Sequence, residues 1–134
     1  MNPDYKSIAA KLKFEGRAFI DGKYVDAIDG EKFENINPAT GEILCSVAKC
    51  NHKDVDLAVK VSRKAFNSGV WSRTSPEFRK DVLLKFAELL RQTGEENSVL
   101  ECVDTGKLIG DCINEVANDA PMHFQWYGEL IDKV

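Results

Sequence analysis

The sequence predicts a mixed α/β fold in which a small β-rich cap precedes a set of helices. Two short apolar runs flank Asp21-Gly22, and an Asp-Gly pair in this position is the strongest short-range signal for a β-hairpin. Beyond about residue 51 the apolar residues recur at helical spacing, and Ser75-Pro76 has the composition of a helix start. The change of period between these two regions sets the fold class.

The composition is that of an ordinary globular domain. The chain has 134 residues, of which 43% are hydrophobic, so it can build one domain with a core of its own. Its formal net charge is -4, with basic residues scattered among acidic ones, so we expect neither nucleic acid nor an anionic membrane as partner. No run approaches the roughly 18 apolar residues of a membrane span, and the first residues lack the pattern of a secretory signal. We therefore expect a cytoplasmic protein.

The N-terminal third is predicted to be an arm followed by two hairpins. Residues 1–17 should form a short helical or loose arm, because their apolar residues are only partly periodic. Residues 19–25 form the first predicted hairpin. A second extended pair is predicted over 33–37 and 43–48, joined by a turn at 38–41 that contains proline and glycine.

Helices are predicted from residue 51 onward. The first begins near Asn51 or His52 and ends at Gly69, and the second begins with Ser75 as its N-cap and Pro76 in its first turn. Each of the two has an apolar stripe on one face. The stripes consist of Val55, Ala58, Val59, Ala65 and Phe66 in the first helix, and of Phe78, Val82, Phe86, Leu89 and Leu90 in the second.

Glycine and proline divide the rest of the helical region. Gly94 should break or kink the second helix, and a third helical piece over 95–103 should end at the C-cap Gly106. The last segment, about 109–134, keeps helical spacing, although Pro121 should bend or restart it. The aromatic residues are expected to lie in the core; they are Phe66, Trp71, Phe78, Phe86, Phe124, Trp126 and Tyr127.

The cysteines allow three interpretations. A disulfide framework is not expected without a secretory signal. Zinc sites use closely spaced Cys or His pairs, whereas here the spacings within the two cysteine pairs are four and nine intervening residues. Structural thiols are therefore favoured over the two alternatives. These are a metal site, which could recruit His52 and His123, and a reactive thiol. The four residues are Cys45, Cys50, Cys102 and Cys112.

One long stretch carries a family resemblance. It reads Phe66-x-x-Gly69-x-Trp71-Ser72, then Ser75-Pro76-Glu77-x-Arg79, and it closes with Asp104-Thr105-Gly106-Lys107. In this order and spacing it resembles the N-terminal part of the NAD(P)-dependent aldehyde dehydrogenases. The segment Asn37-Pro38-Ala39-Thr40-Gly41-Glu42 is similar to the family's opening turn, so the resemblance covers about residues 18–134. The family usually has proline where this chain has Leu108, which puts the geometry of that turn in doubt.

The resemblance implies that 18–134 is an incomplete N-terminal segment of the family's cofactor-binding domain. It would comprise a β-hairpin cap and several helices without the parallel nucleotide-binding sheet. The family's nucleophilic cysteine, glutamate base, oxyanion-binding asparagine and nucleotide-binding residues lie downstream of the matching region, and these 134 residues contain no Gly-x-Gly-x-x-Gly pattern. We therefore assign no catalytic and no cofactor-binding residue here. NAD or NADP is expected in the intact enzyme and neither is expected in this chain.

The resemblance also implies two sites. Asn35 and Ile36, through their backbone carbonyls, and the carboxylate of Asp104 match residues that hold a structural Na⁺ or K⁺ in the family, and oxygen ligands suit such a hard cation. The alternative for Asp104 is a local turn in which it accepts backbone N–H groups. Asp119 matches a helix that lines the family's substrate tunnel, where acidic residues attract cationic aldehydes. Its alternative role is that of a solvated helix residue or a cap before Pro121.

Three functional hypotheses follow. In the first, the chain is a non-catalytic scaffold segment of an aldehyde dehydrogenase, in contact with the remainder of that fold and part of a homo-oligomer; the ending from Trp126 to Val134 is most similar to the aminoaldehyde and polyamine-aldehyde branch. In the second, it is a free-standing, self-associating helical module, because helix faces without a sheet would be exposed. The third, a zinc or redox module, has poor cysteine spacing against it.

Overall fold

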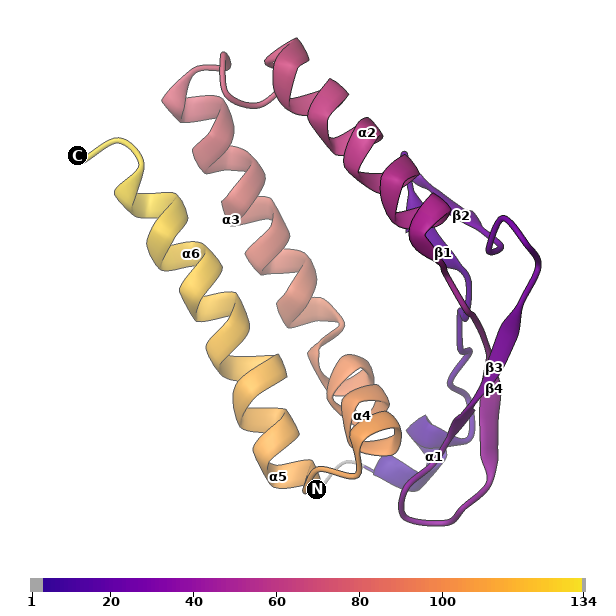
Figure 1. The fold of residues 1–134 in the computed structure, drawn as a ribbon. Helices are drawn as coiled ribbons and strands as arrows, with labels where there is room; N and C mark the ends of the chain where they lie inside the picture. The colour runs from indigo at the N-terminus through magenta and orange to yellow at the C-terminus, as the bar shows by residue number, and fades with distance from the viewer. Residues whose placement is uncertain (1–3, 134) are drawn as a thin grey trace. The chain divides into compact units, whose positions relative to one another are not determined.

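The structure is a computed structural model that describes residues 4–133, and it divides into two compact units (Figure 1). One unit consists of residues 13–73 and contains both hairpins and one long helix. The other contains, among the described residues, 4–12 and 74–133, and it is helical. The expected order of a β-rich cap before helices is confirmed, and a short helix, α1 (Tyr5–Ala9), precedes both.

The first hairpin forms where the Asp-Gly turn predicts it. Strands β1 (Ala18–Ile20) and β2 (Lys23–Val25) pair antiparallel, with Phe19 opposite Tyr24. Asp21 and Gly22 have φ values of 55° and 75°, which is the left-handed pair that a type I′ turn needs. This turn twists in the same sense as the strands, so a two-residue connection suffices.

The second hairpin consists of β3 (Lys32–Ile36) and β4 (Ile43–Ala48), again antiparallel. The register shifts between Asn35 and Ile36, which marks an irregularity in the ladder just before the turn. Asn37 closes that turn: its backbone carbonyl accepts from the Gly41 N–H at 2.8 Å and its side-chain oxygen accepts from the Ala39 N–H at 2.9 Å. The Asn-Pro turn expected from the sequence is confirmed.

The segment before β1 crosses β4 at very close range. The Gly16 carbonyl accepts a hydrogen bond from the Ala48 N–H at 2.7 Å. A Cβ atom on Gly16 would lie 2.0 Å from the carbonyl oxygen of Ser46, closer than any side chain allows. Only glycine therefore permits this crossing.

Helix α2 (His52–Ser68) begins with a capping box. The Asn51 side chain accepts from the Lys53 N–H at 2.8 Å, and Asp54 accepts from the Asn51 N–H at 2.9 Å. The other carboxylate oxygen of Asp54 accepts from the Ile28 N–H at 2.9 Å, and the Asp54 residue is only 2% exposed. One buried carboxylate thus starts the helix and fixes the loop after β2 against it. The helix ends at Gly69, as predicted.

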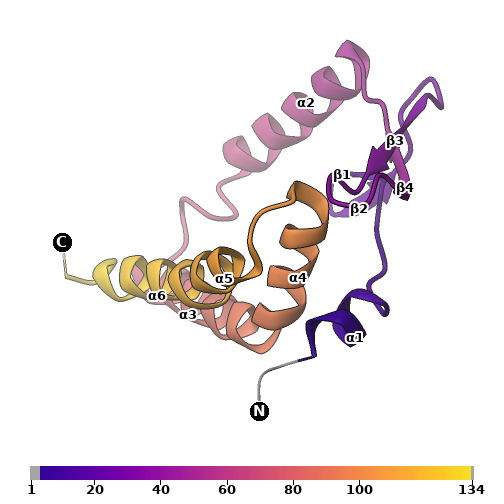
Figure 2. The same ribbon diagram turned by 90° about the horizontal axis from the view of Figure 1, so that it is seen from below.

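The helical unit is built around two long antiparallel neighbours, α3 and α6, which lie side by side in both views (Figures 1 and 2). Helix α1 contacts α4, and α4 contacts the segment that leads into α6. The element bounds are α3 (Pro76–Gln92), α4 (Gly94–Thr105), α5 (Ile109–Cys112), the π-helix η1 (Ile113–Asp119) and α6 (Ala120–Leu130).

Small residues allow α3 and α6 to approach each other. Ala87 of α3 is fully buried, and a Cβ on Gly128 of α6 would lie 3.1 Å from the Cβ of Leu83. Phe86 and Phe124 meet edge to face with ring centroids 4.6 Å apart. These contacts use one face of α3, so its other face remains available.

Helix α4 packs against η1 with almost no space between the backbones. A Cβ on Gly94 would meet the Cβ of Ala117 at 2.9 Å and its Cα at 3.0 Å. The fully buried Ser98 hydroxyl lies 2.7 Å from the Gly94 carbonyl and 3.2 Å from the Cys112 carbonyl, so it bridges the two segments. Ser75 as the N-cap of α3, the break at Gly94 and the C-cap at Gly106 are all confirmed.

The predicted bend at Pro121 takes the form of a π-helix. Proline has no N–H to donate and its ring would collide with the carbonyl four residues earlier, that of Ala117. Within η1 the chain switches to wider turns, and the Ala120 N–H donates to the carbonyl of Glu115, five residues back. Pro121 then sits in the first turn of α6, where its missing N–H costs nothing.

The expectation that the aromatic residues form the core is wrong. All seven are more than a third exposed, from 38% for Phe124 to 67% for Phe66. The apolar stripes of α2 and α3 are exposed in the same way, because no sheet or further layer covers them among residues 4–133. The buried hydrophobic residues described are small: Ala27, Ala48, Ala87, Val99 and Cys112. Over the same residues, no helix is long and apolar enough to cross a membrane.

Replacing Asp54 by alanine is expected to destabilise the 13–73 unit. The change leaves the N–H groups of Ile28 and Asn51 without their partly buried acceptor, at a cost of about 1–3 kcal/mol in the free energy of unfolding. Urea unfolding followed by circular dichroism measures it. The exposed Asp56→Ala change on the same helix serves as control and should cost less than about 1 kcal/mol; equal effects would contradict the role of Asp54.

Replacing Gly94 by alanine is expected to destabilise the helical unit by about 1–3 kcal/mol, because the new methyl group overlaps Ala117. Gly110→Ala is the matched control: a Cβ there meets nothing within 4 Å, and the substitution in helix α5 should be neutral or stabilising. Thermal unfolding of the two variants compares them. A Gly94→Ala protein as stable as the Gly110→Ala protein would show that α4 and η1 are not in close contact.

Candidate functional site

The three residues expected to hold a monovalent cation are placed on two elements. Asn35 is half-buried and Ile36 exposed, both at the end of β3 where the register shifts. Asp104 is exposed near the end of α4. The first two belong to the 13–73 unit and Asp104 to the helical unit. The cation site therefore stays a prediction from the resemblance.

The turn after Asp104 is well formed. Gly106 adopts φ 75° and its N–H donates to the Cys102 carbonyl at 3.0 Å, while the Thr105 hydroxyl donates to the carbonyl of Glu101 at 2.7 Å. Leu108, which replaces the family's proline, has φ -60°. A proline ring fixes φ near this value, so the backbone at Leu108 has a φ that a proline would also adopt.

Asp119, the predicted substrate-tunnel residue, is the last residue of η1 and is exposed. Its backbone carbonyl accepts a hydrogen bond from Nδ1 of His123 at 2.7 Å. One turn further along α6, Trp126 and Tyr127 are 63% and 61% exposed, and with His123 they line a shallow hollow. The exposure of these aromatic rings could not be predicted from the sequence, because helical periodicity alone does not show which faces of a helix are covered.

The four cysteines are spread over β4, the loop before α2, α4 and α5. All four cysteines are free, and Cys112 is fully buried with its Sγ 4.0 Å from the Lys107 carbonyl. Burial raises the pKa of the Cys112 thiol, which lowers the thiolate fraction that a nucleophile or metal ligand needs. Across residues 4–133 no three His, Cys, Asp or Glu side chains cluster in a way that could hold a metal ion.

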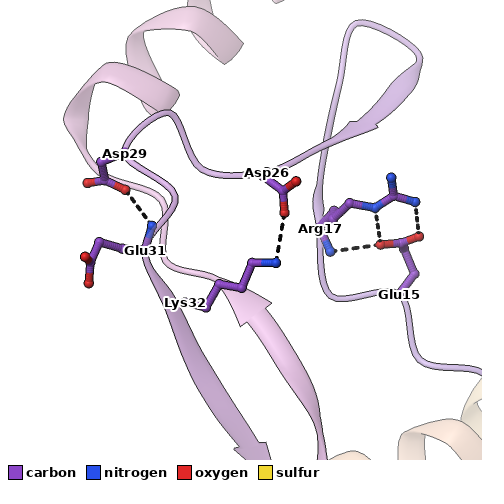
Figure 3. A network of polar contacts seen from close by, with 6 residues as sticks. All are labelled: Glu15, Arg17, Asp26, Asp29, Glu31 and Lys32. Carbon is purple, nitrogen blue, oxygen red and sulfur yellow. Dashed lines mark hydrogen bonds and ion pairs between the residues drawn. The ribbon is translucent and has the colours of Figure 1, made fainter.

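An exposed polar network lies around the two hairpins (Figure 3). Arg17 forms a two-pronged contact with the Glu15 carboxylate, at 2.8 Å from Nε and 2.6 Å from a terminal nitrogen, and its guanidinium lies over the Tyr24 ring. Lys32 pairs with Asp26 at 3.2 Å. The Asp29 carboxylate accepts from the Glu31 N–H at 3.0 Å and from the Asn51 side chain at 2.7 Å, so these contacts hold the loops around the hairpins in place.

The sequence profile of the aldehyde dehydrogenase family matches residues 24–134. The chain belongs to this family. The match begins within the first hairpin and includes all the helices from α2 onward, so both units of the chain are part of the family's fold.

Bacterial family members resemble the chain over nearly its whole length. An aminoacetaldehyde dehydrogenase of Pseudomonas aeruginosa is 44% identical over 131 residues, which is 98% of this chain and 26% of the relative. The NADP/NAD-dependent aldehyde dehydrogenase PuuC of Escherichia coli is 40% identical over 126 residues, 94% of this chain and 26% of the relative. The chain thus spans about a quarter of the length of these aldehyde dehydrogenases.

Solved family structures share the same backbone. The indole-3-acetaldehyde dehydrogenase AldA of P. syringae, in complex with NAD⁺ and IAA, superimposes with a TM-score of 0.92 at 44% identity, over 98% of this chain and 26% of the AldA chain. The aldehyde dehydrogenase KauB of Pseudomonas aeruginosa gives the same TM-score at 43% identity and the same coverage. The α/β fold class, with two hairpins and several helices that correspond to a part of the family's fold, is confirmed.

The Glu15–Arg17 pair makes a prediction for acid titration. Hydrogen bonds from Arg17 lower the pKa of Glu15 to about 2, below its ordinary value of 4.5. The pair therefore contributes its stability above about pH 4.5 and loses it as the pH falls toward 2. Carbon NMR of the Glu15 carboxyl should show this low pKa, and Arg17→Met should return it to the ordinary range. Lys32→Met, which removes the partner of Asp26 instead, should leave it unchanged; a Glu15 pKa insensitive to Arg17 would contradict the pairing.

Proposed function

We propose that the chain is the N-terminal scaffold segment of an NAD(P)-dependent aldehyde dehydrogenase and is not catalytic by itself. The observation that supports this most strongly is the exposure of apolar helix faces. Val59 and Phe66 of α2, and Phe78 of α3, are 50–67% exposed, although they lie on regular amphipathic helices. Such faces are suited to cover another layer of the fold.

The chemistry of the proposed whole enzyme also supports a non-catalytic role for this chain. Oxidation of an aldehyde to an acid in this family needs a thiolate, a carboxylate base, an oxyanion donor and a nicotinamide cofactor, which accepts the hydride when bound. In this chain the buried Cys112 thiol has a raised pKa, and the 134 residues contain no glycine-rich nucleotide-binding pattern. In this proposal the chain covers other layers of the fold within a homo-oligomeric enzyme. The reacting groups belong to the rest of that fold.

We propose an aminoaldehyde as the substrate of the intact enzyme, with Asp119 near its cationic end. The P. aeruginosa relative at 44% identity is an aminoacetaldehyde dehydrogenase. Asp119 is exposed and lies one helical turn before His123, which lines a hollow with Trp126 and Tyr127. A carboxylate beside aromatic faces suits an ammonium group, because both interact favourably with a cation.

A chimera tests the scaffold role. The matching 131-residue segment of the P. aeruginosa aminoacetaldehyde dehydrogenase is replaced by this chain, and NADH formation is followed with aminoacetaldehyde and with an uncharged aldehyde of similar size. We expect an active chimera, whereas the 134-residue chain alone should neither bind NAD⁺ or NADP⁺ in calorimetry nor turn over aldehyde. Cofactor binding by the chain alone, or a chimera that folds without activity, would contradict the proposal.

The same chimera tests Asp119. Asp119→Asn should raise KM for the aminoaldehyde by about tenfold, since one charge interaction of roughly 1.4 kcal/mol is lost. The KM for the uncharged aldehyde should not change. An equal effect on both substrates would show that Asp119 supports the fold and does not contact the cationic end.

A further inference from the structure

The imidazole of His123, in the first turn of α6, is held by the backbone through one of its two nitrogens. Its Nδ1 lies 2.7 Å from the carbonyl oxygen of Asp119, four residues earlier. A carbonyl oxygen can only accept a hydrogen bond, so Nδ1 is the nitrogen that carries a proton and donates it. In the neutral ring the other nitrogen, Nε2, is then unprotonated. The contact with Asp119 therefore makes Nε2 a hydrogen-bond acceptor.

This acceptor is open to a ligand. His123 is exposed, and among residues 4–133 the Asp119 carbonyl is the one group hydrogen-bonded to its ring. The Nδ1 contact also restrains the rotation of the imidazole, so Nε2 is oriented before a ligand arrives. An acceptor that is oriented in advance loses less conformational entropy when it forms a hydrogen bond.

The surroundings of His123 on α6 are aromatic and apolar. His123 lines a shallow hollow with Met122, Trp126 and Tyr127, all of which are exposed. Residues three and four apart in a helix lie on the same side, so Trp126 and Tyr127 follow His123 directly along that side. None of the four lining residues is a lysine or an arginine. The hollow thus combines one nitrogen acceptor with two aromatic rings and has no cationic side chain of its own.

This combination suits an ammonium group. The N–H bonds of an ammonium need acceptors, and the faces of tryptophan and tyrosine rings attract a cation. Three other hollows of the helical unit are each lined by a lysine, which would repel a cationic ligand. These lysines are Lys11, Lys85 and Lys133. The hollow at His123 is therefore better suited to an ammonium group than these three.

We propose that His123 is a specificity-determining residue of the intact enzyme, with Nε2 accepting a hydrogen bond from the ammonium group of an aminoaldehyde. This inference rests on the proposed function and deepens it, because it adds a second residue to the recognition of the cationic end. The two residues contribute differently. Asp119 supplies negative charge, whereas His123 supplies a directed hydrogen bond, and the backbone carbonyl of Asp119 orients the ring that makes it.

Substitutions of His123 in the chimera test this role. His123→Phe keeps an aromatic ring and removes both nitrogens, so KM for aminoacetaldehyde should rise by about tenfold while kcat stays nearly constant. His123→Gln places an amide oxygen at about the reach of Nε2, so it should restore most of the lost affinity. The KM for an uncharged aldehyde of similar size should be the same in all three proteins. A merely structural role for His123 would not separate the two aldehydes.

His52→Phe is the matched control, because it makes the same change at an exposed histidine at the start of α2. It should leave both KM values unaltered. The proposal would be overturned by a His123→Phe chimera with an unaltered KM for aminoacetaldehyde, or with an equal loss for both aldehydes. A His123→Gln protein as impaired as His123→Phe would also overturn it. A failure of the scaffold role looks different, because the chimera with His123 intact would then lack activity toward every aldehyde.

Nitrogen NMR of the 134-residue chain tests the inference without the chimera. The two ring nitrogens of a neutral histidine have different chemical shifts when one is protonated and the other is not. We expect the spectrum to show Nδ1 of His123 protonated and Nε2 unprotonated. A neutral His123 ring with its proton on Nε2 would overturn the proposal, because Nε2 would then donate and could not accept from an ammonium group.

Discussion

Covering the apolar faces of the long helices is the constraint on which the rest of this structure depends. Helix α3 packs one face on α6 through Ala87 and Gly128, and the second face stays exposed. Helix α2 buries Asp54 alone among its residues. Amphipathic helices gain most of their stability from packing rather than from propensity, so helices of this kind are stabilised when another surface covers them.

Close backbone contacts and hydrogen bonds stabilise each unit, in part replacing the large hydrophobic core that other proteins have. The Asp54 carboxylate fixes the loop after β2 to the start of α2, and the Ser98 hydroxyl bridges α4 to the end of α5. Gly16 and Gly94 let backbones approach to distances that no side chain would permit. These contacts are local and directional, so each unit is ordered although few large side chains are buried within it.

The functional proposals follow from this combination of local hydrogen bonds and open apolar helix faces. A segment whose polar groups are satisfied locally, and whose apolar faces are open, is suited to be one layer of a larger fold. Membership of the aldehyde dehydrogenase family, over about a quarter of its relatives' length, agrees with this role. Asp119, at the end of η1, is the residue that we propose to meet the cationic end of the substrate.

Much of the secondary structure was determined by the sequence itself, because its signals are local. Asp21-Gly22 specifies a type I′ turn, Ser75-Pro76 a helix start and Gly106 a helix end, and all three are present. The order and spacing of the motifs between Phe66 and Lys107 likewise sufficed to predict the family. Tertiary contacts decided what local signals do not encode: which faces are covered, and how the chain accommodates Pro121. A π-helix precedes α6 because the backbone there adjusts to Pro121. The aromatic residues are exposed because burial depends on neighbours far along the sequence. The predicted cation site, with backbone ligands at Asn35 and Ile36, rests on the resemblance for the same reason.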